Sequence, residues 1–218
     1  MRLDIFSDTI CPWCFIGKRR LERALAARPQ PDLTIRWRAF QLNPDMPPDG
    51  MDRRAYLETK FGGAARTARV YEAVTAAGAA EGIEFDFGRI GRTPNTLESH
   101  RLLRFAFEHG RQDALVETLF RTYFVDGADI GDRAVLVAAA AEAGLDADAA
   151  RRFLEGDAEA DSVRDEDVLA RRQGINGVPC FVFNGRFGLS GAQDPEVFFQ
   201  LFDLAREDDA AEREAAAG

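Results

Sequence analysis

Cysteine and histidine are scarce in this sequence, and their scarcity excludes several ways of building a stable domain. Three cysteines and two histidines occur among 218 residues. Three cysteines cannot supply the dense disulfide framework that stabilises many small secreted domains. A structural zinc site normally needs two pairs of Cys or His ligands, and the chain holds only one such pair. We therefore expect no metal site.

Basic charge and long apolar segments are also lacking. The net charge is −9 at pH 7, which argues against a surface that binds nucleic acid or anionic membranes. No apolar run is long enough to cross a bilayer. The N-terminus enters an apolar run at Leu3 without the basic, apolar and cleavage-site regions of a signal peptide. We therefore expect a cytoplasmic protein whose partners are neither nucleic acids nor membranes.

What the chain does contain is enough apolar material for a large core. Hydrophobic residues make up 46% of the sequence, and 17 phenylalanines against three tyrosines predict a dry, aromatic interior. A chain of 218 residues suits one large domain or a domain that carries an insertion.

The chain is organised around Cys11-Pro12-Trp13-Cys14. The apolar run from Leu3 to Phe6 predicts a buried strand, and a helical period begins at Cys11. Proline suits the first helical position, because its missing N–H would have no partner there. Cys11 therefore lies at a helix N-terminus, and the two sulfurs emerge on the same side of the first turn, within disulfide reach.

This position gives the pair its chemistry. Free N–H groups and the positive end of the helix dipole favour the anionic form of Cys11, and a thiolate is both the nucleophile and the better leaving group. Cys14 lies deeper in the helix and is suited to close the ring. A structural disulfide or half of a zinc site are the alternatives, but a Cys-x-x-Cys between a strand and a helix favours a redox role.

The remaining pattern predicts a βαβ unit, a helical segment and an αββα ending. A strand from Leu33 to Ala39 completes the first unit with a parallel pair. Asn184-Gly185 predicts a hairpin between a strand over 180–183 and a partner over 186–189. The predicted helices cover 53–61, 67–81, 95–108, 113–124, 132–143, 146–154 and 162–173, with a glycine-bearing loop over 85–94 and a last helix that starts at Pro195.

These elements predict an α/β fold with an inserted all-helical subdomain. The discontinuous α/β domain would span 1–44 and 161–207, the insertion 45–160, and a disordered tail 208–218.

Read together, this layout resembles the thioredoxin-like fold of the DsbA family of thiol oxidoreductases, and its motifs resemble the FrnE-like subgroup. The motifs that carry the resemblance are Cys11-Pro12-Trp13-Cys14 followed by Phe15-Ile16-Gly17-Lys18, Phe40-Gln41-Leu42-Asn43-Pro44, Pro94-Asn95-Thr96 with His100-Arg101-Leu102, Gly177-Val178-Pro179, and Ser190-Gly191-Ala192-Gln193.

The resemblance implies a thiol–disulfide oxidoreductase in which Cys11 attacks and Cys14 resolves the mixed disulfide. It also implies a cis peptide bond between Val178 and Pro179 that faces the cysteines and leaves the Val178 backbone free to pair with an extended substrate. Pro12 and Trp13 would form part of the docking surface. No metal or organic cofactor is implied, and protein or small-molecule thiols and disulfides would be the partners.

Four further residues are candidate auxiliaries. Cys180 would share a sheet face with Val178, directed toward the Cys-x-x-Cys helix, as a third redox partner or as a small buried residue. His100 would face the groove as a proton donor or acceptor, or be a packed histidine. Ser190 and Gln193 belong to the turn before the last helix.

His109 is predicted to be structural, and Lys18, Arg19 and Arg20 are predicted to form a solvated face.

Two other functions stay open. Related enzymes of the 2-hydroxychromene-2-carboxylate isomerase and kappa-class transferase type hold glutathione near the cis-proline and the turn here formed by 190–194, where helix N–H groups would suit a carboxylate. Against this, those enzymes usually carry a serine at the position of Cys11.

The other alternative is a redox-switched chaperone without catalysis. The direction of exchange, the substrate, the recycling partner and the oligomeric state do not follow from the sequence.

Overall fold

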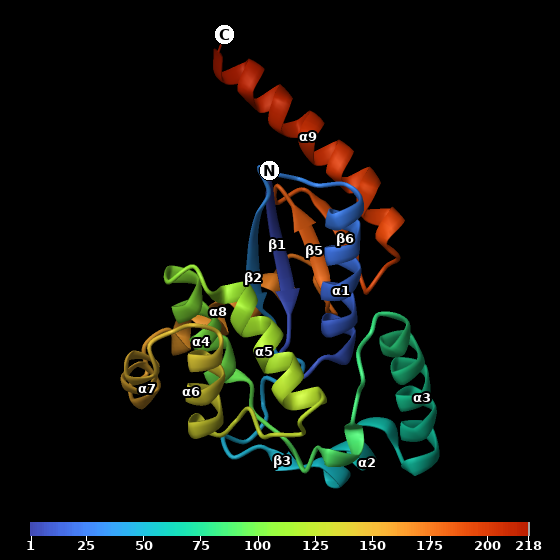
Figure 1. Ribbon diagram of the computed structural model, residues 1–218, viewed down its shortest axis with the longest axis vertical. Helices are drawn as coiled ribbons and strands as arrows, with labels where there is room; N and C mark the ends of the chain where they lie inside the picture. The colour runs from blue at the N-terminus through green and yellow to red at the C-terminus, as the bar shows by residue number, and fades with distance from the viewer. Residues whose placement is uncertain (218) are drawn as a thin grey trace.

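A four-stranded sheet forms the centre of the fold in this computed structural model, which describes residues 1–217 (Figure 1). Its strand order is β2-β1-β5-β6. β1 (Arg2–Ser7) runs parallel to β2 (Thr34–Ala39) and antiparallel to β5 (Cys180–Phe183), and β6 (Phe187–Ser190) returns antiparallel to β5. The predicted parallel pair and the predicted hairpin are therefore confirmed.

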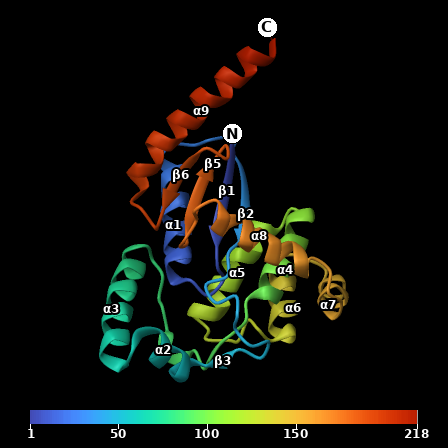
Figure 2. The same cartoon turned by 180° about the vertical axis from the view of Figure 1, so that it is seen from behind.

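Helices cover both faces of this sheet. α1 (Pro12–Ala27) and α9 (Pro195–Ala217) lie together on one face, and α8 (Ala160–Arg172) crosses the other, as the view from behind shows (Figure 2). Phe181 of β5 packs edge-to-face on Phe198 of α9. A thioredoxin-like sheet with helices on both faces is the fold that the pattern predicted.

The helices that follow β2 along the chain gather at one end and one side of the sheet (Figure 1). They are α2 (Arg53–Phe61), α3 (Ala64–Ala80), α4 (Leu97–Glu108), α5 (Gln112–Phe124), α6 (Arg133–Glu142) and α7 (Ala147–Glu155). Each of the seven helices predicted between residues 53 and 173 is present, with ends that differ by up to three residues from the prediction. The segment expected to be a loop instead contains the 3₁₀ turn η1 (Phe87–Arg89) and β4 (Arg92–Thr93), which pairs with β3 (Met51–Asp52). Ladders of two residues leave no periodicity to detect.

α5 and α8 cover the edge strand β2 through side-chain hydrogen bonds. The Gln112 amide accepts from the Trp37 N–H at 2.9 Å and donates to the Trp37 carbonyl at 3.0 Å. Glu166 of α8 accepts from the Ala39 N–H at 2.7 Å. These side chains satisfy backbone groups that an edge strand otherwise leaves open.

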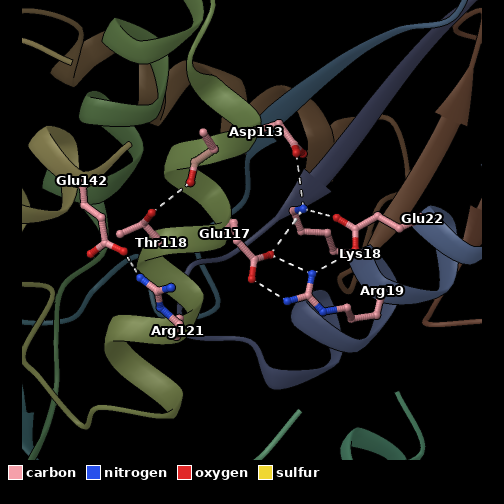
Figure 3. A network of polar contacts seen from close by, with 9 residues as sticks. Lys18, Arg19, Glu22, Asp113, Glu117, Thr118, Arg121 and Glu142 are labelled. Atoms are coloured by element: carbon pink, nitrogen blue, oxygen red, sulfur yellow. Dashed lines mark hydrogen bonds and ion pairs between the residues drawn. The ribbon is translucent and has the colours of Figure 1, made fainter. Parts of the chain in front are cut away.

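A buried lysine joins α1 to α5 (Figure 3). Lys18 was predicted to lie on a solvated face, but its side chain is 4% exposed. Its Nζ lies 3.3 Å from carboxylate oxygens of both Asp113 and Glu117, and it also donates to Glu22. Arg19 adds a pair with Glu117 at 2.5 Å. That prediction was wrong because the α5 carboxylates lie far away in sequence and have no local signal near Lys18.

We expect the Lys18→Met variant to lose about 2 kcal/mol of stability, below the full cost of breaking a buried pair because the carboxylates are partly exposed. Burial alone would raise the pKa of Glu22, but Lys18 and Arg19 outweigh burial and lower it. A lowered carboxyl pKa contributes stability above its unfolded value of about 4.3, and this contribution is lost as the pH falls through the folded pKa. The difference in the free energy of unfolding between the variant and the wild type, measured by urea unfolding, should therefore become smaller as the pH is lowered. Arg164→Met, which breaks the exposed pair with Asp161, is the control and should change little.

The C-terminal segment corrects another prediction. Residues 208–218 were expected to be disordered, but α9 is helical to Ala217, and Gly218 lies outside the described residues. Asp208 pairs with Arg186 of the hairpin, and Asp209 pairs with the N-terminal amino group at 2.7 Å. Contacts with the hairpin and the N-terminus thus hold the part of the helix that follows its apolar face.

Within residues 1–217, no helix combines the length and the apolar character that a membrane crossing requires.

Candidate active site

The turn between β1 and α1 places Cys11 at the N-terminus of the helix. Cys11 is the N-cap residue, with an extended backbone (φ −96°, ψ 111°), and no side chain caps the helix there. Its N–H donates to the Asp8 carbonyl at 3.0 Å, and its own carbonyl accepts from the Cys14 N–H at 3.0 Å. Pro12 occupies the first helical position, as predicted. The uncapped helix end therefore favours a negative charge at the Cys11 sulfur.

The two thiols differ in their surroundings. Both are free, Cys11 is 5% exposed and Cys14 is fully buried. Burial and then the neighbouring Cys11 raise the pKa of the Cys14 thiol well above its usual value, while hydrogen bonds with the Ser7 side chain and the Asp8 backbone oppose this rise. Cys11 is thus the less buried of the two thiols, and Cys14 is enclosed behind it.

The chain that faces Cys11 comes from the segment before β5. The Cys11 Sγ lies 3.5 Å from the Val178 carbonyl, and the Val178–Pro179 peptide bond is cis, as the resemblance implies. Trp13 is 37% exposed between the cysteines. The structure therefore brings together the five residues from two distant segments: Cys11, Pro12, Trp13, Val178 and Pro179.

Gly17 allows α1 to approach Pro179 closely. A Cβ atom at Gly17 would lie 2.9 Å from Pro179 Cγ and 3.2 Å from Phe181 Cζ. The first distance is too short for two carbon atoms, so any larger residue must push the Pro179 loop away from the helix.

We expect Gly17→Ala to displace Pro179 and to lower stability by about 1 kcal/mol. The helix propensity of alanine contributes about 1 kcal/mol in favour, but overpacking costs about 1–3 kcal/mol. Thermal unfolding and the rate at which Cys11 reacts with a disulfide reagent should both change. Gly177→Ala is the matched control, because nothing lies within 4 Å of a Cβ atom there. Equal behaviour of the two variants would contradict this prediction.

The turn before α9 lies beside the Pro179 loop. The Gly191 N–H donates to the Pro179 carbonyl at 2.8 Å, and Arg20 of α1 donates to the Ala192 carbonyl at 2.6 Å. Gln193 is exposed and donates to the Ser190 carbonyl at 2.9 Å. Arg20 was predicted to be solvated, but this contact and its ion pair with Asp194 at 3.0 Å fix the turn to α1.

Cys180 lies on the opposite side of the sheet from its predicted position. It belongs to a cluster with Phe6, Phe40 and Ala170 on the α8 face, and it is paired in register with Ser190. Burial raises the pKa of the Cys180 thiol, and a hydrogen bond with Ser190 opposes the rise. The expectation that it faces the Cys-x-x-Cys helix was wrong, because Phe181 is the β5 residue that contacts α1. Ser190 therefore lies with Cys180 and not with Cys11.

His100 is placed next to the site but not in its groove. Of the two alternatives that the sequence left open, the structure shows the packed histidine: His100 is 2% exposed, and its Nε2 lies 3.4 Å from the buried Oδ1 of Asp8. Asp8 is not among the residues that the sequence predicted for the site. The signal that could have identified Asp8 is its position three residues before Cys11.

Across residues 1–217, no group of three or more potential metal ligands is present.

Comparison with known proteins agrees with this architecture. The family profile described as "DSBA-like thioredoxin domain" matches residues 2–203. A probable DsbA oxidoreductase from Streptomyces coelicolor is 38% identical, with a TM-score of 0.86 over 95% of this chain and 90% of its own.

Two more distant structures share the fold. The cytosolic disulfide reductase DsbM from Pseudomonas aeruginosa, solved with GSH, is 20% identical with a TM-score of 0.63, over 98% of this chain and 100% of its own. A 2-hydroxychromene-2-carboxylate isomerase is 17% identical with a TM-score of 0.66, over 99% of this chain and 98% of its own. At these identities the likeness concerns the fold alone.

Proposed function

The chain belongs to the family of DSBA-like thioredoxin domains, and from this we propose that it exchanges disulfides through Cys11 and Cys14. The observation that carries the proposal is the asymmetry of the two thiols. Cys11 lies at an uncapped helix N-terminus and is 5% exposed, while Cys14 is fully buried one turn later. The sequence motifs support the further proposal that the chain belongs to the FrnE-like subgroup.

In the reductive direction, the Cys11 thiolate attacks one sulfur of a substrate disulfide and the other sulfur leaves with the electron pair. Cys14 then loses its proton and attacks Cys11, which releases the second substrate sulfur and leaves a Cys11–Cys14 disulfide. The substrate gains two electrons and the protein loses two. In the oxidative direction the same steps run in reverse, and the reduction potential of the pair against that of its partners decides which direction operates.

Substrate contacts would come from the groups beside Cys11. The exposed Trp13 ring and Pro12 offer an apolar surface, and the Val178 backbone at 3.5 Å from the Cys11 sulfur would orient an extended substrate. No resident metal or organic cofactor enters these steps. Glutathione or a protein thiol would return the pair to its starting state, and we place the reaction in the cytosol.

The proposal is tested by equilibrating the protein with defined ratios of reduced and oxidised glutathione. We expect a two-electron transition in which Cys11 and Cys14 become resistant to alkylation together, while Cys180 behaves the same throughout. Mass spectrometry of the alkylated peptides identifies each thiol, and turnover of a disulfide-bonded peptide is measured in parallel. A protein that forms no Cys11–Cys14 disulfide at any ratio would overturn the proposal.

A glutathione-dependent isomerase or transferase is the second candidate. It is favoured by the turn over 190–194, which lies beside the Pro179 loop and opens α9, where backbone N–H groups suit a carboxylate. Such an enzyme would need only one thiol or hydroxyl at the helix end. Full glutathione-dependent turnover by the Cys14→Ser variant would support it over disulfide exchange.

A further inference from the structure

The sheet face that α8 crosses carries a cavity that disulfide exchange does not use. Its volume is about 610 Å³, and neither Cys11 nor Cys14 lines it. Leu169 and Ile175 line it from the end of α8 and the segment that follows, and Arg186 lines it from the β5–β6 hairpin. Cavities of a few hundred Å³ are large enough to hold a small molecule.

Two rows of side chains from the four strands form the floor of this cavity. The strand register gives the first row, from β2 to β6, as Arg36, Asp4, Val182 and Gly188. In the same order, the second row is Arg38, Phe6, Cys180 and Ser190. All of these residues line the cavity. The floor is therefore cationic at its β2 end, apolar around Phe6 and Val182, and formed by small residues at its β6 end.

The carboxylates that line the cavity already have basic partners. Asp4 lies 3.0 Å from the guanidinium of Arg2 and 3.7 Å from that of Arg38. Glu166 of α8 is 5% exposed and lies 2.6 Å from Arg38. The charges of Arg2 and Arg38 are thus balanced within the protein.

Arg36 is different, because no carboxylate of residues 1–217 forms an ion pair with it. Its guanidinium packs over the Phe107 ring instead, 4.5 Å from the centroid. Burial and the charge of Arg38 lower the pKa of Arg36, while Glu166 opposes this effect. A positive charge is therefore left without a counter-ion at the β2 end of the floor, although the net charge of the protein is −9. Guanidinium groups form strong charge-assisted hydrogen bonds with carboxylates and phosphates, so an anion would complete this end of the cavity.

We propose that the cavity binds a small organic anion. Arg36 and Arg38 hold its phosphate or carboxylate group, and its apolar body rests on Phe6 and Val182. Gly188 leaves room at the far end of the floor, because nothing lies within 4 Å of a Cβ atom there. The inference does not depend on disulfide exchange, since it concerns other residues on the other face of the sheet.

The shape and the charge of the site limit the class of ligand. Neighbouring strands lie about 4.8 Å apart, so a floor that crosses four strands is about 14 Å long. This length suits an elongated molecule that is charged at one end and apolar along the rest. A nucleic acid is a poor ligand, because its many phosphates would meet a protein of net charge −9.

Binding can be tested by calorimetric titration of the full chain with 2-naphthyl phosphate and with 2-naphthoate. Each probe joins one anionic group to an apolar body, and the probe that binds more tightly tells whether the site prefers phosphate or carboxylate. We expect saturable binding with one site per chain, and binding of uncharged 2-naphthol that is at least about tenfold weaker. A Kd weaker than about 1 mM for both anions would overturn the inference.

Three variants locate the bound probe. Arg36→Met removes the cation, and Gly188→Leu keeps every charge but fills the far end of the floor. We expect each to weaken binding of the preferred probe about tenfold or more. Arg164→Met is the matched control, because it removes a guanidinium of α8 that pairs with Asp161 outside the cavity. It should keep the Kd within about twofold of the wild type.

Thermal unfolding checks that the variants are folded, since neither Arg36→Met nor Gly188→Leu removes an ion pair. Equal losses of affinity in Arg36→Met and Arg164→Met would mean that net charge alone attracts the probe. Wild-type affinity in Gly188→Leu would place the probe outside the cavity. Either result would overturn the inference.

Cys180 provides a readout inside the cavity that needs no substitution. Its thiol lines the floor and is 6% exposed. In the reduced protein, a saturating concentration of the preferred probe should slow alkylation of Cys180 by N-ethylmaleimide several-fold and leave alkylation of Cys11 unchanged. Mass spectrometry of the peptides measures both rates. Alkylation of Cys180 at the same rate with and without the probe would contradict the inference.

Discussion

The Cys11→Ser variant is expected to lose disulfide exchange by about a thousandfold or more, down to the uncatalysed rate. A serine hydroxyl at the helix N-terminus is neither ionised at neutral pH nor able to form a disulfide. Helix α1 itself should persist, because Pro12 still starts it and no side chain capped it before. Circular dichroism and the unfolding midpoint of the variant should therefore match the wild type while turnover of a disulfide-bonded peptide disappears.

Replacing the second cysteine has a different expected result. Cys14→Ser keeps the attacking thiol, so it should react once and then accumulate a mixed disulfide with the substrate, visible as a mass increase that dithiothreitol reverses. Cys180→Ser is the control and should keep full activity, because Cys180 lies on the α8 face of the sheet. Turnover that survives Cys11→Ser, or that needs Cys180, would show that a different thiol starts the reaction.

The largest expected loss of stability follows from Arg101→Met. Arg101 is 1% exposed, and its guanidinium donates to the carbonyls of Phe153, Gly156 and Ala158 at 3.2, 2.6 and 2.7 Å. Its Nη1 also donates to both carboxylate oxygens of Glu98, at 2.8 and 2.9 Å. One side chain therefore satisfies the C-terminal end of α7 and the chain that leads into α8.

Methionine fills much of the same volume but donates nothing, so three carbonyls and a carboxylate lose their partner. Breaking a buried ionic contact of this kind costs about 3–5 kcal/mol. For a chain of this size each kcal/mol lowers the melting temperature by about 2–4 °C, which makes a decrease of about 10 °C or more the expected result in calorimetry. Arg151→Met on the exposed side of α7 is the matched control, since its pair with Asp148 is solvated. A loss below about 1 kcal/mol for Arg101→Met would contradict this assignment.

Local chemistry explains which predictions succeeded. The helix over 53–61 was predicted with its observed ends, because Asp52 caps its first turn and Gly62 ends it in the left-handed region (φ 72°). The position of Cys11 at a helix start followed in the same way from Pro12 and from the change in apolar period. In each case the signal lies within a few residues of the feature that it predicts.

The predictions that failed depended on partners distant in sequence. Lys18 is buried only because Asp113 and Glu117 lie across from it, and nothing near Lys18 announces them. Strand alternation could place Cys180 on one face of the sheet but could not say which helix covers that face. Asp8 and His100 likewise come from elements far apart in sequence, and the neighbouring contact between Thr9 and Ser99 spans 90 residues.

The cover over β2 also determines how this protein can associate with another chain. Gln112 and Glu166 already bind backbone groups on the outer side of β2, so an extended polypeptide cannot add a strand there without displacing them. Because β2 and β6 are the two ends of the strand order, intermolecular β-sheet formation is directed to β6, which offers only four residues, one of them Gly188. A strand this short is a poor template for ordered aggregation. The helices between β2 and β5, which supply Gln112 and Glu166, thus protect the sheet from edge-to-edge polymerisation.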